Sequence, residues 1–188
     1  STSVYGPQSE LVDENCDKSE LKPQTPYADI KLLEENLIKK NLKESKYFIL
    51  RLGTIYGFSP GIRFHTAVNK FCFQSCMDTP LTVWKTAYNQ KRPYLGLDDF
   101  NNLILHLLNK KAKNNEIYNI VSMNLTVKQI INSIKKFKSL KITYVDHPIM
   151  NQLSYEISNK KIKNTKFDFK SNLQKNIKET IQKLIKIS

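Results

Sequence analysis

Two short stretches decide the fold of this chain: Ser1-Thr2-Ser3-Val4-Tyr5-Gly6 and Tyr27-Ala28-Asp29-Ile30-Lys31. Tyr27 and Lys31 are four residues apart, so a helix over this stretch places both side chains on one face. A phenol titrates at about pH 10, and an ammonium beside it favours the phenolate and lowers that pKa. Ser1 can donate a hydrogen bond to a substrate oxygen from the end of a neighbouring strand. The spacing therefore predicts a site for proton transfer.

The rest of the chain alternates short apolar runs with helical segments. We expect strands that end or lie at residues 1–5, 47–52, 81–84, 91–95, 116–121 and 140–145. We expect helices at residues 26–43, 64–77, 98–109, 126–137, 160–165 and 173–187, and a loop at 53–63. Pro26 suits the first turn of its helix, and Asp98 and Thr126 are expected N-caps. Strands that alternate with helices predict an α/β fold with a parallel sheet.

The composition is that of a folded globular chain. Its 188 residues suffice for one core, with room for a small additional lobe. A hydrophobic content of 40%, with nine Tyr, nine Phe and one Trp, excludes a disordered tail. No apolar run reaches the roughly 18 residues of a membrane span, so we expect no membrane partner.

The charge pattern argues against a nucleic-acid partner, although the formal net charge is +13. All but three of the 30 basic residues are lysines, scattered over expected helix surfaces without interleaved aromatic residues that would stack bases. The three arginines are Arg51, Arg63 and Arg92. Their planar guanidinium groups suit phosphate, which indicates a diphosphate ligand. Arg51 lies inside an expected strand, so we expect its role to be structural.

The three cysteines, Cys16, Cys72 and Cys76, indicate free thiols in a reducing cytoplasm. Cys72 and Cys76 can share a helical face, but nothing near them in the sequence completes a zinc set. We therefore expect no metal site.

Further motifs extend the pattern: residues 48–57 (FILRLGTIYG), 92–99 (RPYLGLDD) and 154–158 (SYEIS). With them, the chain resembles the extended short-chain dehydrogenase/reductases, the NAD-dependent nucleotide-sugar epimerase/dehydratase family. The resemblance implies the C-terminal part of a Rossmann-type doubly wound parallel sheet, plus a small α/β substrate-binding lobe. Residues 1–55 would end the Rossmann-type domain and carry the catalytic helix. Residues 56–188 would form mainly the lobe, with about 92–121 returning to the sheet.

The family's glycine-rich turn for the dinucleotide pyrophosphate is missing from this sequence. Its five glycines, at positions 6, 53, 57, 61 and 96, nowhere form G-x-x-G-x-x-G. We therefore expect the sequence to be a fragment, or the ordered part, of a longer chain.

The resemblance also assigns roles to individual residues. Ser1, Tyr27 and Lys31 would be catalytic, and NAD would lie against Tyr27, Lys31, Gly53, Thr54 and Ile55, with NADP left open. The substrate would contact Ser3, His65, Asn69, Thr82, Trp84 and Arg92. Two of these positions keep an alternative: His65 as a helix-start residue that only caps or packs, and Trp84 as a core residue.

The type of reaction follows from the residues after Ser1. Thr2 and Ser3 stand where the family's 4,6-dehydratases have Asp and Glu, and Ser3 stands where its 3,5-epimerases have Cys. The resemblance therefore implies epimerisation of a nucleotide-diphosphate sugar through a transient keto-sugar, rather than reduction or dehydration. It also implies a homodimer formed through the Tyr27 helix. The alternative is a catalytically silent module for substrate binding or dimerisation.

Overall fold

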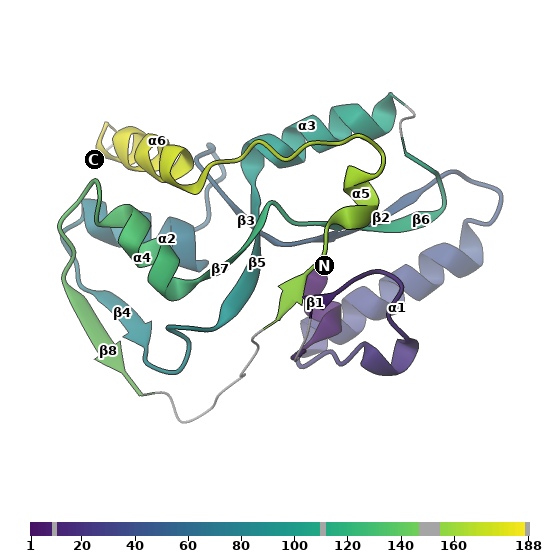
Figure 1. Cartoon of the computed structure of the whole chain (residues 1–188), viewed down its shortest axis with the longest axis horizontal. Coiled ribbons are helices and arrows are strands. Elements are labelled where there is room, and N and C mark those ends of the chain that lie inside the picture. Colours follow the sequence, from purple (N-terminus) through teal and green to yellow (C-terminus); the bar gives the residue numbers. More distant parts are fainter. Residues whose placement is uncertain (9–10, 110–111, 147–154, 187–188) are drawn as a thin grey trace.

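The computed structural model describes residues 1–8, 11–109, 112–146 and 155–186 (Figure 1). Its helices are α1 (Pro26–Asn41), α2 (Ala67–Cys76), α3 (Leu97–Leu108), α4 (Val127–Ile134), α5 (Lys160–Lys163) and α6 (Leu173–Ile185), with 3-10 helices η1 (Thr2–Tyr5) and η2 (Lys18–Glu20). Its strands are β1 (Leu11–Val12), β2 (Phe48–Leu52), β3 (Thr54–Tyr56), β4 (Leu81–Trp84), β5 (Lys91–Gly96), β6 (Glu116–Ile120), β7 (Met123–Thr126), β8 (Ile142–Val145) and β9 (Glu156–Ile157).

Parallel pairing dominates the strands, as the alternation of strands and helices predicts. The parallel pairs are β1–β9, β2–β6, β3–β5 and β4–β8. The β2–β6 pair runs in register from Phe48 opposite Glu116 to Leu52 opposite Ile120. One pair among the described strands, β5–β7, is antiparallel. The α/β fold class is therefore confirmed.

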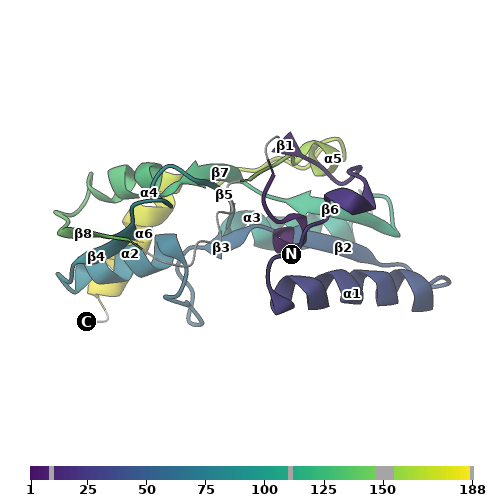
Figure 2. The ribbon, with the colours of Figure 1, turned by 90° about the horizontal axis from the view of Figure 1, so that it is seen from below.

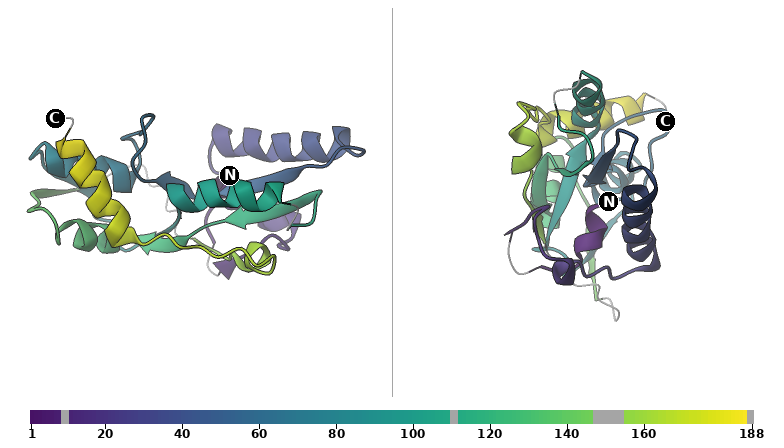
Figure 3. Two further views of the ribbon diagram at one scale, coloured as in Figure 1. Left: turned by 90° about the horizontal axis from the view of Figure 1, so that it is seen from above. Right: turned by 90° about the vertical axis from the view of Figure 1, so that its right-hand side faces the viewer.

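The described residues form three clusters of buried apolar side chains, of which the smallest joins η1, β1 and β9 and the two larger ones lie at opposite ends of the molecule. One of the larger clusters packs α2, α4 and α6 around β4 through residues such as Phe71, Ile131 and Ile181. The other packs α3 and α5 against β2 and β6 through Leu103, Ile120 and other buried residues. The strands β3, β5 and β7 lie between these two groups of elements (Figure 1). The helix α1 lies on one side of the β2–β6 pair and α5 on the other (Figures 2 and 3).

Local capping signals predicted the starts of α1 and α4 correctly. Thr25 caps α1, because its hydroxyl accepts a hydrogen bond from the Ala28 N–H at 3.2 Å, and Pro26 occupies the first turn. Thr126 caps α4 together with Gln129 in a capping box.

The prediction that Asp98 caps α3 is wrong, because the N-cap is Gly96 and no side chain caps the helix. The neighbouring Asp99 is buried instead. Its carboxylate accepts hydrogen bonds from the Lys170 N–H at 2.7 Å, from the Ser171 N–H and from the Ser122 hydroxyl at 2.5 Å. Asp99 therefore ties the segment that leads into α6 to the start of α3.

Residues 1–5 do not form the expected strand end. They form η1, in which Ser1 Oγ accepts a hydrogen bond from the Ser3 N–H at 3.3 Å and Gly6 ends the turn at a φ of 63°. A Cβ added to Gly6 would lie 1.8 Å from the Lys22 carbonyl oxygen, so the following loop requires glycine here.

The expected loop at residues 53–63 contains β3, which pairs with β5. The strands β1, β7 and β9 and the helix η2 also went unpredicted. Of the motif at residues 154–158, the first residue lies outside the described ranges.

The structural role expected of Arg51 is confirmed. Its guanidinium is buried and donates to Glu35, from Nε to Oε1 at 3.0 Å and from Nη2 to Oε2 at 2.7 Å. The guanidinium also lies over the Tyr5 ring, 4.7 Å from its centroid. Burial alone would lower the pKa of Arg51, but the hydrogen bonds to Glu35 hold it above its usual range. The pair joins α1 to β2.

Among the described residues, no helix has the length and apolar character that a membrane span needs.

Candidate active site

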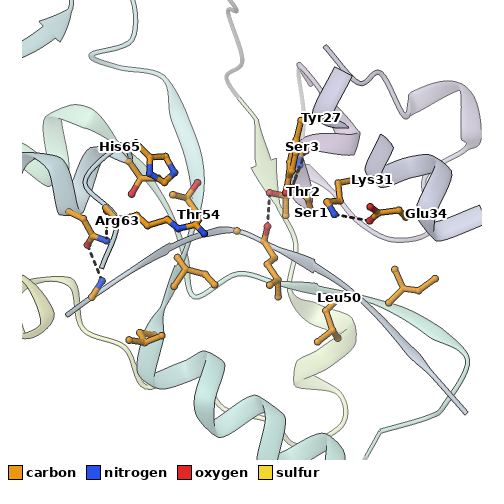
Figure 4. Close-up of a pocket in the computed structure, with 18 of the residues that line it drawn as sticks. Ser1, Thr2, Ser3, Tyr27, Lys31, Glu34, Leu50, Thr54, Arg63 and His65 are labelled. Carbon is orange, nitrogen blue, oxygen red and sulfur yellow. Dashed lines mark hydrogen bonds and ion pairs between the residues drawn. The ribbon is translucent and has the colours of Figure 1, made fainter. Parts of the chain in front are cut away.

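A cavity of about 910 Å³ lies between α1 and the segment that runs from β2 to α2 (Figure 4). This volume falls within the range of roughly 300–1,000 Å³ for small-molecule sites. Nine residues assigned to the site from sequence line the cavity: Ser1, Ser3, Tyr27, Lys31, Gly53, Thr54, Ile55, His65 and Asn69. Apolar side chains of Ile38, Leu50 and Leu52 complete the wall beside α1 and β2.

Tyr27 and Lys31 face the cavity from one side of α1, as their spacing predicts. The Tyr27 side chain is 57% exposed, so its hydroxyl is open to a ligand. Lys31 Nζ lies 5.6 Å from the centroid of the Tyr27 ring and forms an ion pair with Glu34 Oε2 at 2.7 Å. The hydrogen bond to Glu34 raises the pKa of Lys31. The lysine therefore brings a positive charge to the tyrosine.

The turn η1 brings two hydroxyls to the same cavity. Ser1 Oγ lies 3.0 Å from Ser3 Oγ, at hydrogen-bond distance. Between them, the Thr2 hydroxyl donates to the Leu52 carbonyl oxygen at 3.2 Å and is buried. Thr2 thus anchors η1 to the end of β2, and Ser1 and Ser3 lie on the cavity wall (Figure 4).

Gly53 lets the chain pass from β2 into β3 close to β5. Its N–H donates to the Ile120 carbonyl oxygen at 3.0 Å. A Cβ at this position would lie 3.1 Å from the Pro93 backbone, closer than ordinary van der Waals contact. Glycine here therefore keeps β3 against β5, which places Thr54 and Ile55 on the cavity wall.

Asn69 holds the loop on the far side of the cavity. Its Oδ1 accepts a hydrogen bond from the Gly57 N–H at 3.1 Å, and its Nδ2 donates to the Arg63 carbonyl oxygen at 3.3 Å. Asn69 is buried, and these two bonds join α2 to both ends of the loop. The loop then presents Arg63 and His65 to the cavity (Figure 4).

Three residues assigned to the substrate from sequence do not line this cavity: Thr82, Trp84 and Arg92. Thr82 and Trp84 point outward from β4, and Trp84 is 46% exposed, which excludes its alternative as a core residue. The Arg92 guanidinium lies over the ring of Tyr155, 5.7 Å from the centroid, and Tyr155 does line the cavity. Arg92 therefore contacts a residue of the cavity wall without lining the cavity itself.

Five charged or aromatic cavity residues were not assigned to the site from sequence: Glu34, Glu35, Phe48, Arg63 and Tyr155. A signal existed for Arg63, which was one of only three arginines, and for Glu34, which follows Lys31 at helical i,i+3 spacing. Among the described residues, no group of three or more His, Cys, Asp or Glu side chains is placed to hold a metal ion.

The sequence profile described as the NAD dependent epimerase/dehydratase family matches residues 1–121. The chain belongs to this family. The match includes η1, the helix α1 that carries Tyr27 and Lys31, and the strands β2, β3, β5 and β6.

Solved structures of several enzymes share the fold of this chain. UDP-glucuronic acid 4-epimerase from Bacillus cereus in complex with NAD is 25% identical, with a TM-score of 0.82 over 98% of this chain and 59% of its own. UDP-glucose 4-epimerase from Thermotoga maritima with UDP-glucose is 20% identical, with a TM-score of 0.82 over 99% and 61%. RMD from Pseudomonas aeruginosa complexed with NADPH is 17% identical, with a TM-score of 0.83 over 99% and 65%.

These similarities establish a Rossmann-type α/β fold for the chain. The chain spans about three fifths of the length of each of these structures.

Proposed function

We propose that the protein containing these residues epimerises the sugar of a nucleotide-diphosphate sugar through a transient keto-sugar. The observation that carries the proposal is the convergence of Ser1, Tyr27 and Lys31 on one wall of the cavity. Family membership supports it, because this is the residue pattern on which the resemblance rests. The absence of carboxylates at Thr2 and Ser3 favours epimerisation over dehydration.

In the proposed reaction, the Tyr27 phenolate accepts the proton of a sugar hydroxyl and later returns it. The Ser1 hydroxyl donates a hydrogen bond to the same sugar oxygen. The Lys31 ammonium, 5.6 Å from the ring centroid of Tyr27, would hold its positive charge beside the phenol during the transfer. Because the exposed Tyr27 side chain points into the cavity, the proton can pass directly between the phenol and a bound sugar.

We propose NAD as the cofactor, with NADP as the alternative. The wall formed by Tyr27, Lys31, Gly53, Thr54 and Ile55 fits the nicotinamide end, because it combines an ammonium and hydroxyls with an adjoining apolar surface. When bound there, the cofactor supplies reversible hydride transfer at the sugar carbon. The sequence holds no glycine-rich turn for the pyrophosphate, so the fit concerns that end alone.

The sugar of the substrate would lie against Tyr27, Ser1 and Ser3, and the rest of the substrate would extend across the cavity toward the loop before α2. His65 and Asn69 line the cavity on that far side, and Asn69 also holds the loop that carries His65. Thr82, Trp84 and Arg92 would contact the nucleotide and diphosphate of a ligand that extends beyond the cavity toward β4 and β5. Trp84 is 46% exposed, and its ring would stack on the base.

The proposed activity is tested by incubating the full-length protein and NAD with a panel of nucleotide-diphosphate sugars. Chromatography coupled to mass spectrometry and proton NMR of the products would identify an inverted sugar carbon. We expect one substrate to reach an equilibrium mixture of two epimers. Binding of a nucleotide sugar without any conversion would instead support the silent binding module.

Arg92→Lys is expected to weaken nucleotide-sugar binding by about 1–3 kcal/mol, because lysine keeps the charge but loses the bidentate guanidinium. Calorimetric titration of the full-length protein would measure this, with NAD titrated in parallel as the control. NAD affinity should stay unchanged. An equal loss of both affinities would show that Arg92 acts through its contact with Tyr155 and is structural.

We also propose a homodimer that forms through α1. The residues Ile30, Leu33 and Leu37 form an apolar stripe on this helix and are 54%, 57% and 47% exposed. Leu33→Asp is expected to convert a dimer to a monomer, measured by light scattering after size-exclusion chromatography. The matched control is Leu105→Asp, since Leu105 is a 61% exposed leucine on α3. A Leu33→Asp variant that stays dimeric would refute the α1 interface.

Two further proposals concern location and domain limits. The three cysteines are free thiols, which favours the cytoplasm, and cell fractionation would test this location.

We also propose the division near residue 55 into a Rossmann-type part and a mainly substrate-binding part. Limited proteolysis of the full-length protein, with cleavage mapped between β3 and α2, would test that division.

A further inference from the structure

Glu34 is a charged residue in the cavity that the proposed reaction leaves without a role. It lies one turn after Lys31 on α1, and its carboxylate receives the Lys31 ammonium at 2.7 Å (Figure 4). Tyr27, Lys31 and Glu34 thus form one stripe of α1, and all three line the cavity. Both members of the ion pair remain partly open to solvent, with 32% of the Lys31 side chain and 49% of the Glu34 side chain exposed.

We propose that Glu34 is a positioning residue that holds the Lys31 ammonium beside Tyr27 and keeps it charged. The proposal rests on the proposed function, because it gives Glu34 a role in the reaction of Tyr27. Glu34 acts through Lys31 and is not itself a group that transfers the proton.

The geometry supports this role because a lysine side chain is long and flexible. Without a partner, its ammonium samples many rotamers, and holding it in one arrangement costs side-chain entropy. The bond to Glu34 fixes Nζ on the cavity side of α1, 5.6 Å from the centroid of the Tyr27 ring. An ammonium fixed there presents its charge to the phenol in every turnover.

The other charged groups around the cavity do not replace Glu34. Glu35, the next residue on α1, is buried and committed to Arg51 from β2. Arg63 and His65 face the cavity from the loop before α2, and a positive charge there would repel the ammonium. Glu34 is the carboxylate that contacts Lys31 among the described residues, and its hydrogen bond raises the pKa of Lys31.

The test compares the wild-type full-length protein with Glu34→Gln, which keeps the side-chain size but removes the charge. Because Glu34 favours the charged lysine, its loss lets Lys31 release its proton at lower pH. NMR titration of protein labelled with carbon-13 lysine, with Lys31 assigned from Lys31→Arg, should therefore show the Lys31 midpoint at lower pH in the variant. The alkaline limb of the pH–kcat profile should move in the same direction.

At the pH optimum, kcat of Glu34→Gln should fall about two- to fivefold, the effect of losing one exposed ion pair. The KM for the nucleotide sugar should stay unchanged, because Glu34 acts on the lysine. Glu34→Asp keeps the negative charge, so the midpoint of its Lys31 titration should return toward the wild-type pH. Glu44→Gln, an exposed charge change in the loop after α1, is the matched control and should alter neither readout.

Coinciding Lys31 titrations in wild type and Glu34→Gln would overturn the proposal, as would a shifted titration with an unchanged pH–kcat profile. A wild-type protein that turns over no nucleotide sugar would instead refute the proposed function. The NMR titration would still report whether Glu34 controls the charge of Lys31.

Discussion

Replacing Tyr27 with phenylalanine is expected to lower kcat by about 10²–10⁴-fold, because a positioned acid/base group contributes that much to a proton transfer. The change removes only the hydroxyl. Since the Tyr27 side chain is 57% exposed, its hydroxyl supports no buried contact, and the variant should fold normally. Nucleotide-sugar affinity should persist, because the phenol acts mainly on the transition state. Initial rates and calorimetric titrations on the full-length protein would measure both quantities.

Tyr155→Phe is the matched control for this experiment. Tyr155 also lines the cavity, but it belongs to the segment that packs against Arg92 and has no proposed part in proton transfer. We expect Tyr155→Phe to retain kcat within a few fold. A Tyr27→Phe variant that turns over at nearly the wild-type rate would remove Tyr27 from the mechanism.

The parts of the fold that sequence could predict are those with local signals. The start of α1 at Thr25 and Pro26 and the capping box of α4 depend on side chains within one helical turn, so the printed sequence is sufficient. The facing pair Tyr27 and Lys31 is predictable for the same reason, because its geometry follows from helical spacing.

The parts that sequence could not predict depend on residues far away in the chain. The strand β3 has only three residues and exists because β5, some 40 residues later, pairs with it. The position of Arg63 depends on Asn69 bonding both ends of its loop, which no local pattern reveals. The turn η1 replaced the expected strand end because the Ser1 side chain and the Thr2 anchor to β2 satisfy its polar groups.

Glu35→Ala is expected to lower the free energy of unfolding by about 3–5 kcal/mol, because it leaves the buried Arg51 guanidinium without its carboxylate. Only 3% of Arg51 and 4% of Glu35 are exposed, so water cannot replace the lost hydrogen bonds. The neighbouring Tyr5 offers a cation–π contact and a side-chain hydrogen bond to the guanidinium, but its neutral phenol does not balance the buried positive charge. Urea unfolding of the full-length protein, followed by circular dichroism, would measure the change.

The chain provides its own control in the adjacent residue. Glu34 also pairs with a cation, but that pair is exposed, so Glu34→Ala should cost less than about 1 kcal/mol. The double variant Arg51→Met with Glu35→Leu should recover much of the lost stability, because removing both charges leaves no buried ion unpaired. Equal losses in Glu34→Ala and Glu35→Ala would show that burial does not set the strength of the Arg51 pair. The contact between α1 and β2 would then depend on apolar packing, and that packing would set the position of Tyr27 on α1.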